Sequence, residues 1–220
     1  MTHPTEHRLR ADARRNRDQI IAAARTVFVT AGTDVPMEEI ARRAGVGVGT
    51  LYRRFPDRGA LVRAVARETL AAVQRDARTA VAEEPTAWAA FARLVTGCPG
   101  VRLTVRLAAR SGPSWTAAQE DPEVARLRSE CLALLDEIVH AAQAEGTLRP
   151  DVDAADVARL LALLFREDPG DSGVVSERIV GLVLDGLRAG PVSGSAADAG
   201  RSSRWSGWAP PAGRSARTPR

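Results

Sequence analysis

The chain has 220 residues, enough for a small domain followed by a larger one, and enough to bury a hydrophobic core without disulfides. No apolar run approaches the roughly 18 to 20 residues of a membrane span, and the polar start lacks a signal-peptide core, which argues against a membrane or secreted protein. Cys98 and Cys131 show no paired spacing, so we expect a reducing compartment, the cytoplasm.

The net charge of +4 is unevenly distributed: residues 1–60 and 191–220 each carry +4, and residues 61–190 carry −4. All 31 basic residues are arginine. This bias reflects either a GC-rich genome or the suitability of arginine for bidentate phosphate and guanine contacts, and composition alone does not separate the two.

Apolar residues recur at helical spacing almost throughout, and no alternating strand pattern appears, so we predict an all-α protein with eight or nine helices. Residues 1–14 are predicted to form a flexible basic arm, followed by a first helix over about 15–31 that Gly32 ends. The apolar face of this helix consists of Ile20, Ile21, Ala24, Val27 and Phe28.

Two short helices follow, over about 36–44 and 48–55, and Gly45 lies in the three-residue turn between them. Two short helices joined by such a turn are the outline of a helix-turn-helix, so residues 15–60 form the predicted DNA-binding domain. Asp57 is then predicted to cap a long helix that extends to about residue 82.

The remainder, over residues 61–190, is predicted to be a helix bundle. Its further amphipathic stretches are 86–96, 101–111, 122–145, 153–167 and 174–189. From Pro191 onward Gly, Ser, Ala, Pro and Arg dominate, and such a composition buries too little apolar surface to offset chain entropy, so residues 191–220 are predicted to be a disordered tail.

The segment Met37–Pro56, with Phe28–Gly32 before it and Arg58–Leu61 after it, closely resembles the N-terminal DNA-binding domain of TetR-family regulators. The resemblance implies major-groove contacts from Val48, Gly49, Thr50, Tyr52 and Arg53. It implies phosphate contacts from Tyr52, Arg54 and Arg58. Gly47 departs from the family pattern, which often has a Ser there that can cap the recognition helix and bond a phosphate.

Two alternatives accompany this interpretation. The segment could be an ordinary helical hairpin with a solvated arginine face. The arginines of the N-terminal arm could lie along phosphates or in the minor groove, or could simply belong to a solvated terminus; they are Arg8, Arg10, Arg14, Arg15 and Arg17.

An apolar set in the bundle could line an effector pocket, as in TetR relatives, although core packing is the more common role for any single member. The set is Trp88, Phe91, Leu94, Leu103, Leu107, Trp115, Leu127, Cys131, Leu134 and Leu135. A second, weaker resemblance, from Arg126 through Asp151 to Leu164, is to the C-terminal domain of an actinobacterial TetR subgroup.

Two late stripes predict a four-helix dimer interface formed with a second copy, unless they face the core of their own protomer. The first stripe is Val157, Leu160, Leu161 and Leu164, and the second is Ile179, Val180, Val183, Leu184 and Leu187.

The expected function is a TetR-type regulator, most simply a repressor that binds a palindromic double-stranded DNA operator as a homodimer and is released by a small apolar effector. No cofactor and no metal are expected, because His3, His7 and His140 lack a third nearby ligand. The rival functions are a helical ligand-scavenging module and a cofactor-independent enzyme, and no catalytic constellation is visible.

Trp205 and Trp208 in the tail could stack on bases or form part of a nonfunctional extension.

Overall fold

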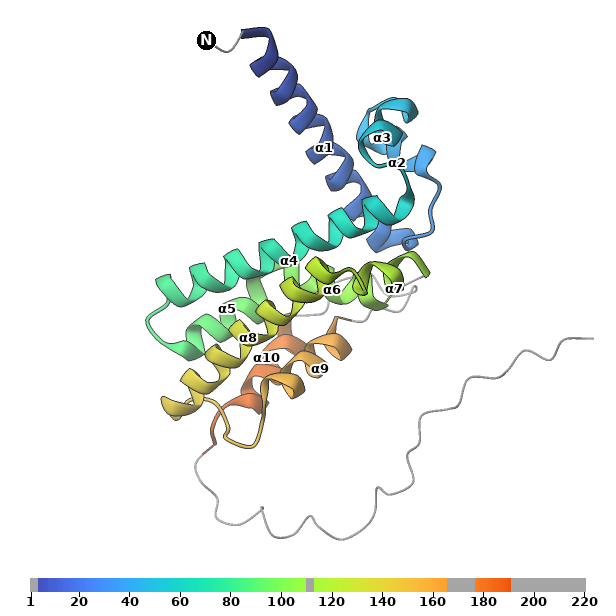
Figure 1. The fold of residues 1–220 in the computed structure, drawn as a ribbon. Helices are drawn as coiled ribbons and strands as arrows, with labels where there is room; N and C mark the ends of the chain where they lie inside the picture. The colour runs from blue at the N-terminus through green and yellow to red at the C-terminus, as the bar shows by residue number, and fades with distance from the viewer. Residues whose placement is uncertain (1–3, 110–112, 166–176, 191–220) are drawn as a thin grey trace, which may run out of the picture. The chain divides into compact units, whose positions relative to one another are not determined.

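The computed structural model describes residues 4–109, 113–165 and 177–190, with side chains from residue 12 onward except at 108 and 109 (Figure 1). The predicted tail, residues 191–220, lies outside this range. The described part contains ten helices and a single antiparallel bridge between Leu148 and Arg188, which confirms the all-α prediction. The helices are α1 Pro4–Ala31, α2 Met37–Ala44, α3 Val48–Arg54, α4 Arg58–Glu83, α5 Ala87–Gly97, α6 Pro99–Ala109, α7 Pro113–Gln119, α8 Pro122–Ala144, α9 Ala154–Leu164 and α10 Glu177–Leu187.

Two features differ from the prediction. The first helix begins at Pro4, so the segment predicted to be a flexible arm continues helix α1 instead. Helix α7, which begins at Pro113, is absent from the prediction, because proline interrupts a helix in its interior although it is favourable in the first turn. Trp115 and Ala118, one turn apart in α7, are both buried and hold this short helix against the rest of the protein.

The first three helices pack into a small head around fully buried side chains, among them Ile20, Phe28 and Leu51. Gly45 ends α2 in the left-handed conformation, at φ 66°, and its amide donates to carbonyls of the last turn. This conformation strains residues with a Cβ, so glycine allows the sharp turn that leads into α3.

The hydrophobic core of the head extends beyond the predicted domain boundary at residue 60. It includes the N-terminal half of α4 and also side chains of α6, α7 and α8, namely Leu107, Trp115, Val124 and Leu127. The head is therefore packed against one end of the bundle rather than attached only through α4.

The second core lies among α4, α5, α8, α9 and α10, with Phe91, Val139 and Phe165 almost completely buried. Helix α4 packs along α8 and α5, so it runs from the head over the body (Figure 1). None of the described helices has the length and hydropathy to cross a membrane.

Candidate nucleic-acid interface and apolar cavity

Helix α3 is anchored by one residue and leaves the rest of its surface exposed. Leu51 is fully buried, whereas Val48 and Tyr52 are 39% and 42% exposed although both are large and largely apolar. Beyond Gly49 there is open space, because a Cβ added there would meet no atom within 4 Å. An exposed helix face with apolar groups and an unobstructed glycine is suited to close contact with another surface.

The positive charges of α3 are available for an anion. Arg53 donates a hydrogen bond from Nη2 to the Thr50 hydroxyl at 3.2 Å, and Arg54 donates from Nη2 to the carbonyl of Ala13 at 3.4 Å. Among the residues described, neither arginine has an acidic partner. No side chain described in the head therefore neutralises them.

Helix α2 differs in this respect. Arg42 and Arg43 both pair with Glu39, and the hydrogen bonds from these two guanidinium groups lower the pKa of that carboxyl. The net positive charge of the hairpin therefore resides on α3.

Six of the seven predicted DNA-contacting residues belong to α3, and all six are exposed or half-buried. Arg58 is different: its Nη1 donates to the carbonyl of Thr33 at 2.9 Å and also to that of Val35. It therefore braces the loop between α1 and α2. Gly47 precedes α3 without a side-chain cap, as its departure from the family pattern led us to expect.

An apolar cavity of about 160 Å³ lies beneath α4, between α5, α6, α8 and α9. Its lining consists of Leu70, Val73, Ala77, Leu94, Val95, Val101, Thr104, Val105, Arg128, Cys131, Leu132, Leu135, Ala158 and Leu161. The Thr104 hydroxyl donates to the carbonyl of Gly100 at 2.8 Å, and the Cys131 thiol donates to the carbonyl of Leu70 at 3.5 Å. Arg128, exposed on α8, brings the only charged side chain in the lining.

Three predicted pocket residues line this cavity: Leu94, Cys131 and Leu135. The other seven are not in its lining and pack into or against the two hydrophobic cores; they are Trp88, Phe91, Leu103, Leu107, Trp115, Leu127 and Leu134. The lining residues that sequence reasoning missed on α4 and α9 look like ordinary core positions, and no signal in the sequence distinguishes them.

The two thiols are poorly suited to nucleophilic chemistry. Burial raises the pKa of Cys131 to about 11, and burial together with a hydrogen bond to Asp76 raises the pKa of Cys98 to about 11. Both thiols are therefore protonated at neutral pH, and the thiolate is the reactive form. No cluster of potential metal ligands occurs within the described residues.

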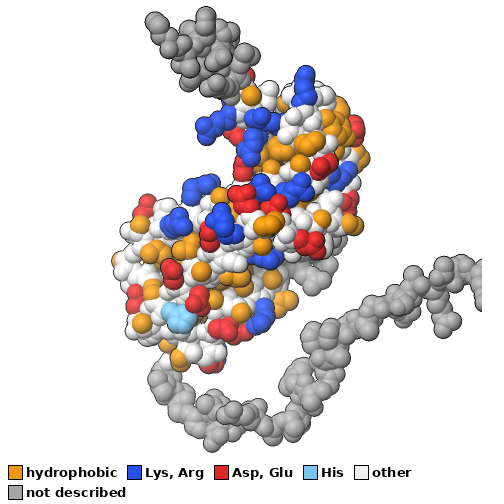
Figure 2. Space-filling view, viewed as in Figure 1, with side chains coloured by type: hydrophobic (Ala, Val, Ile, Leu, Met, Phe, Trp, Pro, Cys, Tyr) orange, Lys and Arg blue, Asp and Glu red, His pale blue; other side chains and the backbone are white. Residues whose placement is uncertain are grey.

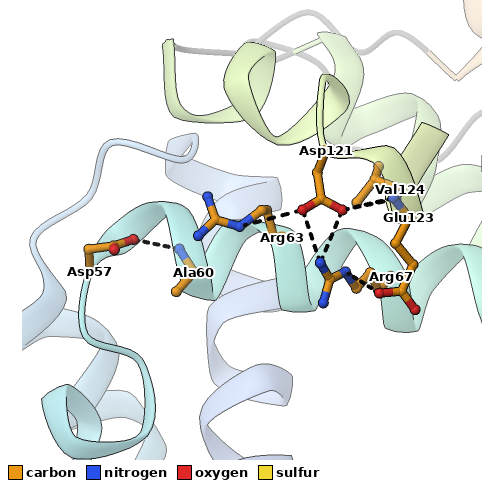
Figure 3. Close-up of polar contacts among 7 residues, drawn as sticks. All are labelled: Asp57, Ala60, Arg63, Arg67, Asp121, Glu123 and Val124. Atoms are coloured by element: carbon orange, nitrogen blue, oxygen red, sulfur yellow. Dashed lines mark hydrogen bonds and ion pairs between the residues drawn. The ribbon is translucent and has the colours of Figure 1, made fainter.

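Asp121 links the beginning of α8 to α4 (Figure 3). Its carboxylate caps α8 by accepting hydrogen bonds from the amides of Glu123 and Val124. It also accepts from Arg67 of α4, with both oxygens 3.0 Å from Nη2, and pairs with Arg63 at 3.8 Å. These contacts, led by the Arg67 hydrogen bond, lower the pKa of Asp121. The carboxylate therefore joins the helix that leaves the head to a wall of the cavity.

The predicted dimer stripes divide between two environments. Val157, Leu161, Val180 and Leu187 are buried in the core of their own protomer, the environment that the alternative to a dimer interface expects. Leu164, Val183 and Leu184 are half-buried and pack against the same core. Leu160 and Ile179 are 37% and 49% exposed, and two leucines outside the prediction, Leu163 and Leu182, are 68% and 62% exposed.

Models of known protein families match both the head and the body of the chain. The model of the family described as bacterial regulatory proteins, tetR family, matches residues 20–65, which contain α2 and α3. A second model, the C-terminal domain of SbtR-like transcriptional regulators, matches residues 86–189. An HTH-type transcriptional regulator of Staphylococcus aureus strain USA300 is 41% identical over 54 residues, which is 24% of this chain and 29% of that relative, so the match spans under a third of the relative's length.

Solved structures extend the likeness to most of the chain. A TetR transcription regulatory protein from Mycobacterium vanbaalenii is 40% identical, with a TM-score of 0.57, over 82% of this chain and 99% of that one. The TetR regulator SCO0520 from Streptomyces coelicolor is 33% identical, with a TM-score of 0.59, over 80% of this chain and 99% of that one. With a helix-turn-helix at its N-terminus and a helical bundle behind it, the chain belongs to the TetR family of DNA-binding transcriptional regulators, which are not enzymes.

Proposed function

We propose that the protein is a repressor that binds a palindromic DNA operator as a homodimer and leaves it when a small apolar compound occupies the cavity. The observation that carries the proposal is the exposed face of α3, where Val48, Gly49 and Tyr52 lie beside two arginines without acidic partners. Arginines of this kind bind phosphates and base edges, and a glycine allows close approach. Such a regulator acts where the chromosome is, in the cytoplasm.

The dimer in this proposal forms through the outer faces of α9 and α10, which lie at the end of the body away from the head (Figure 1). Leu160, Leu163, Ile179 and Leu182 leave much of their apolar surface in water. A second copy related by a twofold axis would cover it with the same residues. Two recognition helices then face two half-sites, as palindromic operators require.

The effector in this proposal is an apolar compound of modest size. The cavity has a volume of about 160 Å³ and a lining that is almost entirely apolar, so it has room for a compound of about the size of benzene. The polar groups of Thr104 and Cys131 already bond to backbone carbonyls. Apart from the exposed Arg128, ligand recognition would therefore depend on shape and apolar contact.

Helices α6 and α8 connect the cavity to the head. On α6, Val105 lines the cavity while Leu107 belongs to the core of the head. On α8, Cys131 lines the cavity and also packs against the core of the head, to which Leu127 belongs. A compound that displaces either helix would therefore shift the packing beneath the recognition helix. For the compound to release DNA, the two positions of the head must differ in their affinity for DNA.

Binding of the purified protein to selected genomic fragments, followed by fluorescence anisotropy at several salt concentrations, tests the proposal. Gly49→Ala is the sharpest variant, because its added methyl meets open space in the free protein and stabilises the helix, yet it would obstruct DNA. Tyr52→Ala removes a side chain that is 42% exposed in the free protein and is therefore available to contact DNA. We expect each variant to lose at least tenfold in affinity with unchanged helicity, and Gly97→Ala on α5 to match the wild type.

Two results would contradict the proposal. If no fragment binds the wild type, the chain has lost regulation, and a ligand-scavenging module becomes the better explanation. If Gly49→Ala and Tyr52→Ala bind like the wild type, α3 does not enter the groove.

A further inference from the structure

A second groove, separate from the apolar cavity, lies where α1 passes over α4. Its volume is about 560 Å³, within the size range of small-molecule sites. Figure 2 shows arginine side chains on both sides of the indentation between the head and the body. The lining consists of Arg14, Arg17, Asp18 and Arg25 from α1, and Glu68, Ala71, Ala72 and Arg75 from α4.

Helical spacing explains why these residues meet. On α4, residues 68, 71, 72 and 75 occupy one face over two turns, and the two alanines leave space between the charged positions. On α1, Arg14, Asp18 and Arg25 lie along a single face. Each wall of the groove therefore carries arginine, three on α1 and one on α4.

The charges of the groove are only partly compensated. Arg17 pairs with Glu68 across the two helices and lies 3.7 Å from Asp18. Within the part of the chain that the structure describes, Arg14, Arg25 and Arg75 make no ion pair and no side-chain hydrogen bond. Three guanidinium groups thus line one hollow without an ion-pair partner among the described residues, while the two carboxylates of the lining, Asp18 and Glu68, lie beside Arg17.

We infer that this groove binds a small polyanion with two or three linked phosphates, such as a nucleoside diphosphate or triphosphate. Guanidinium groups bind phosphate oxygens in bidentate fashion, and several on separate helices can hold successive phosphates. The alanine floor between them has room for an uncharged part of the ligand.

A free polyanion fits this position better than the DNA backbone does. Arg75 lies seventeen residues after the start of α4 at Arg58, about 25 Å along the helix at 1.5 Å per residue. A duplex in contact with α3 lies near the beginning of α4, so the α4 wall of the groove is away from it, whereas Arg14 on the α1 wall follows Ala13, whose carbonyl accepts from Arg54 of α3. The bound polyanion would connect α1, which carries the head, to α4, which runs over the body, and would fix the angle between them.

Inorganic tripolyphosphate is the probe, titrated by calorimetry into the full-length protein at fixed ionic strength, with sulfate as the comparison anion. We expect saturable binding of one tripolyphosphate per protomer and no saturable binding of sulfate. Arg25→Ala with Arg75→Ala should lower the affinity at least tenfold. Arg126→Ala with Arg159→Ala is the matched control, because it removes the same charge from exposed sites outside the groove and should change the affinity less than twofold.

A variant with increased affinity provides a test that remains valid even if the double variant misfolds. Asp18→Asn removes an exposed negative charge from the groove, so tripolyphosphate should bind several-fold more tightly. The inference is overturned if tripolyphosphate does not saturate, if both arginine pairs lose affinity equally, or if Asp18→Asn binds no better. It is also overturned if the groove variant binds tripolyphosphate like the wild type but has weaker operator binding with a smaller salt dependence, because the groove would then contact DNA phosphates.

Discussion

Leu182→Arg should convert the proposed dimer into a folded monomer. Burying a whole leucine side chain stabilises by about 2 kcal/mol, so covering the 62% of Leu182 that is exposed contributes about 1.2 kcal/mol. A symmetric interface counts this contribution twice, which gives about 2.5 kcal/mol, or roughly 60-fold in the dissociation constant. An unpaired guanidinium in the contact adds several kcal/mol more, so we expect the dissociation constant to rise by at least ~1000-fold.

Light scattering over a concentration series measures this constant, and circular dichroism checks that helix content is retained. Leu163→Arg, at a position 68% exposed on α9, should act in the same way. Val81→Arg is the matched control, because Val81 is 56% exposed near the far end of α4 and should leave the dimer intact. A wild-type monomer, or folded variants at positions 163 and 182 that remain dimeric, would refute this choice of interface.

Three further predictions concern single side chains. Arg58→Ala should lower the free energy of unfolding in urea by about 1.5–3 kcal/mol, because two loop carbonyls lose a charged donor, and Arg58→Lys should recover part of it. The pKa of Asp121 is lowered in the fold, so its contribution is complete above its ordinary pKa of 3.8 and disappears as the pH falls through the lowered value. The difference in melting temperature between wild type and Asp121→Asn should therefore be full at pH 7 and should shrink as the pH falls below 3.8 toward the lowered value. Ala158→Phe should fill the cavity and abolish stabilisation by benzene-sized compounds while operator binding persists.

Each of these predictions has a clear contrary result. Unfolding of Arg58→Ala at the wild-type urea concentration would mean that the loop bonds contribute nothing. A melting difference for Asp121→Asn that is constant from pH 7 to 3 would exclude the carboxylate as its cause. Ala155→Phe, at an exposed position on the same helix, is the control for Ala158→Phe, and equal loss of ligand response in both would place the ligand elsewhere.

Much of the fold follows from periodicity and glycine placement. The spacing of Ile20, Ala24 and Phe28 identifies the buried face of α1, and Gly32 and Gly45 mark helix ends because both adopt positive φ. Periodicity does not separate the two edges of a wide apolar stripe. On α9, Leu161 is buried and Leu160 is half in water, and only packing against α8 decides between them.

The candidate site was predictable where the motif itself carries the geometry, as on α3. Arg58 shows the limit: a guanidinium can reach a phosphate or a carbonyl, and only the position of the neighbouring loop shows that it bonds Thr33 and Val35. The cavity shows the same limit, because its lining comes from five helices whose relative placement no local pattern specifies.

The continuity of the head's core through Trp115 and Val124 bears on the engineering of hybrid regulators. A graft that exchanges only residues 15–60 would transplant the motif but leave behind the α7 and α8 side chains that support it. The apolar surface of the grafted head would then be left partly exposed, because the side chains of the recipient's body would not match it. A workable junction would preserve the contact surface of α7 and the first turns of α8, or redesign it together with α1. In this protein the unit of exchange is therefore a packed surface rather than a continuous stretch of sequence.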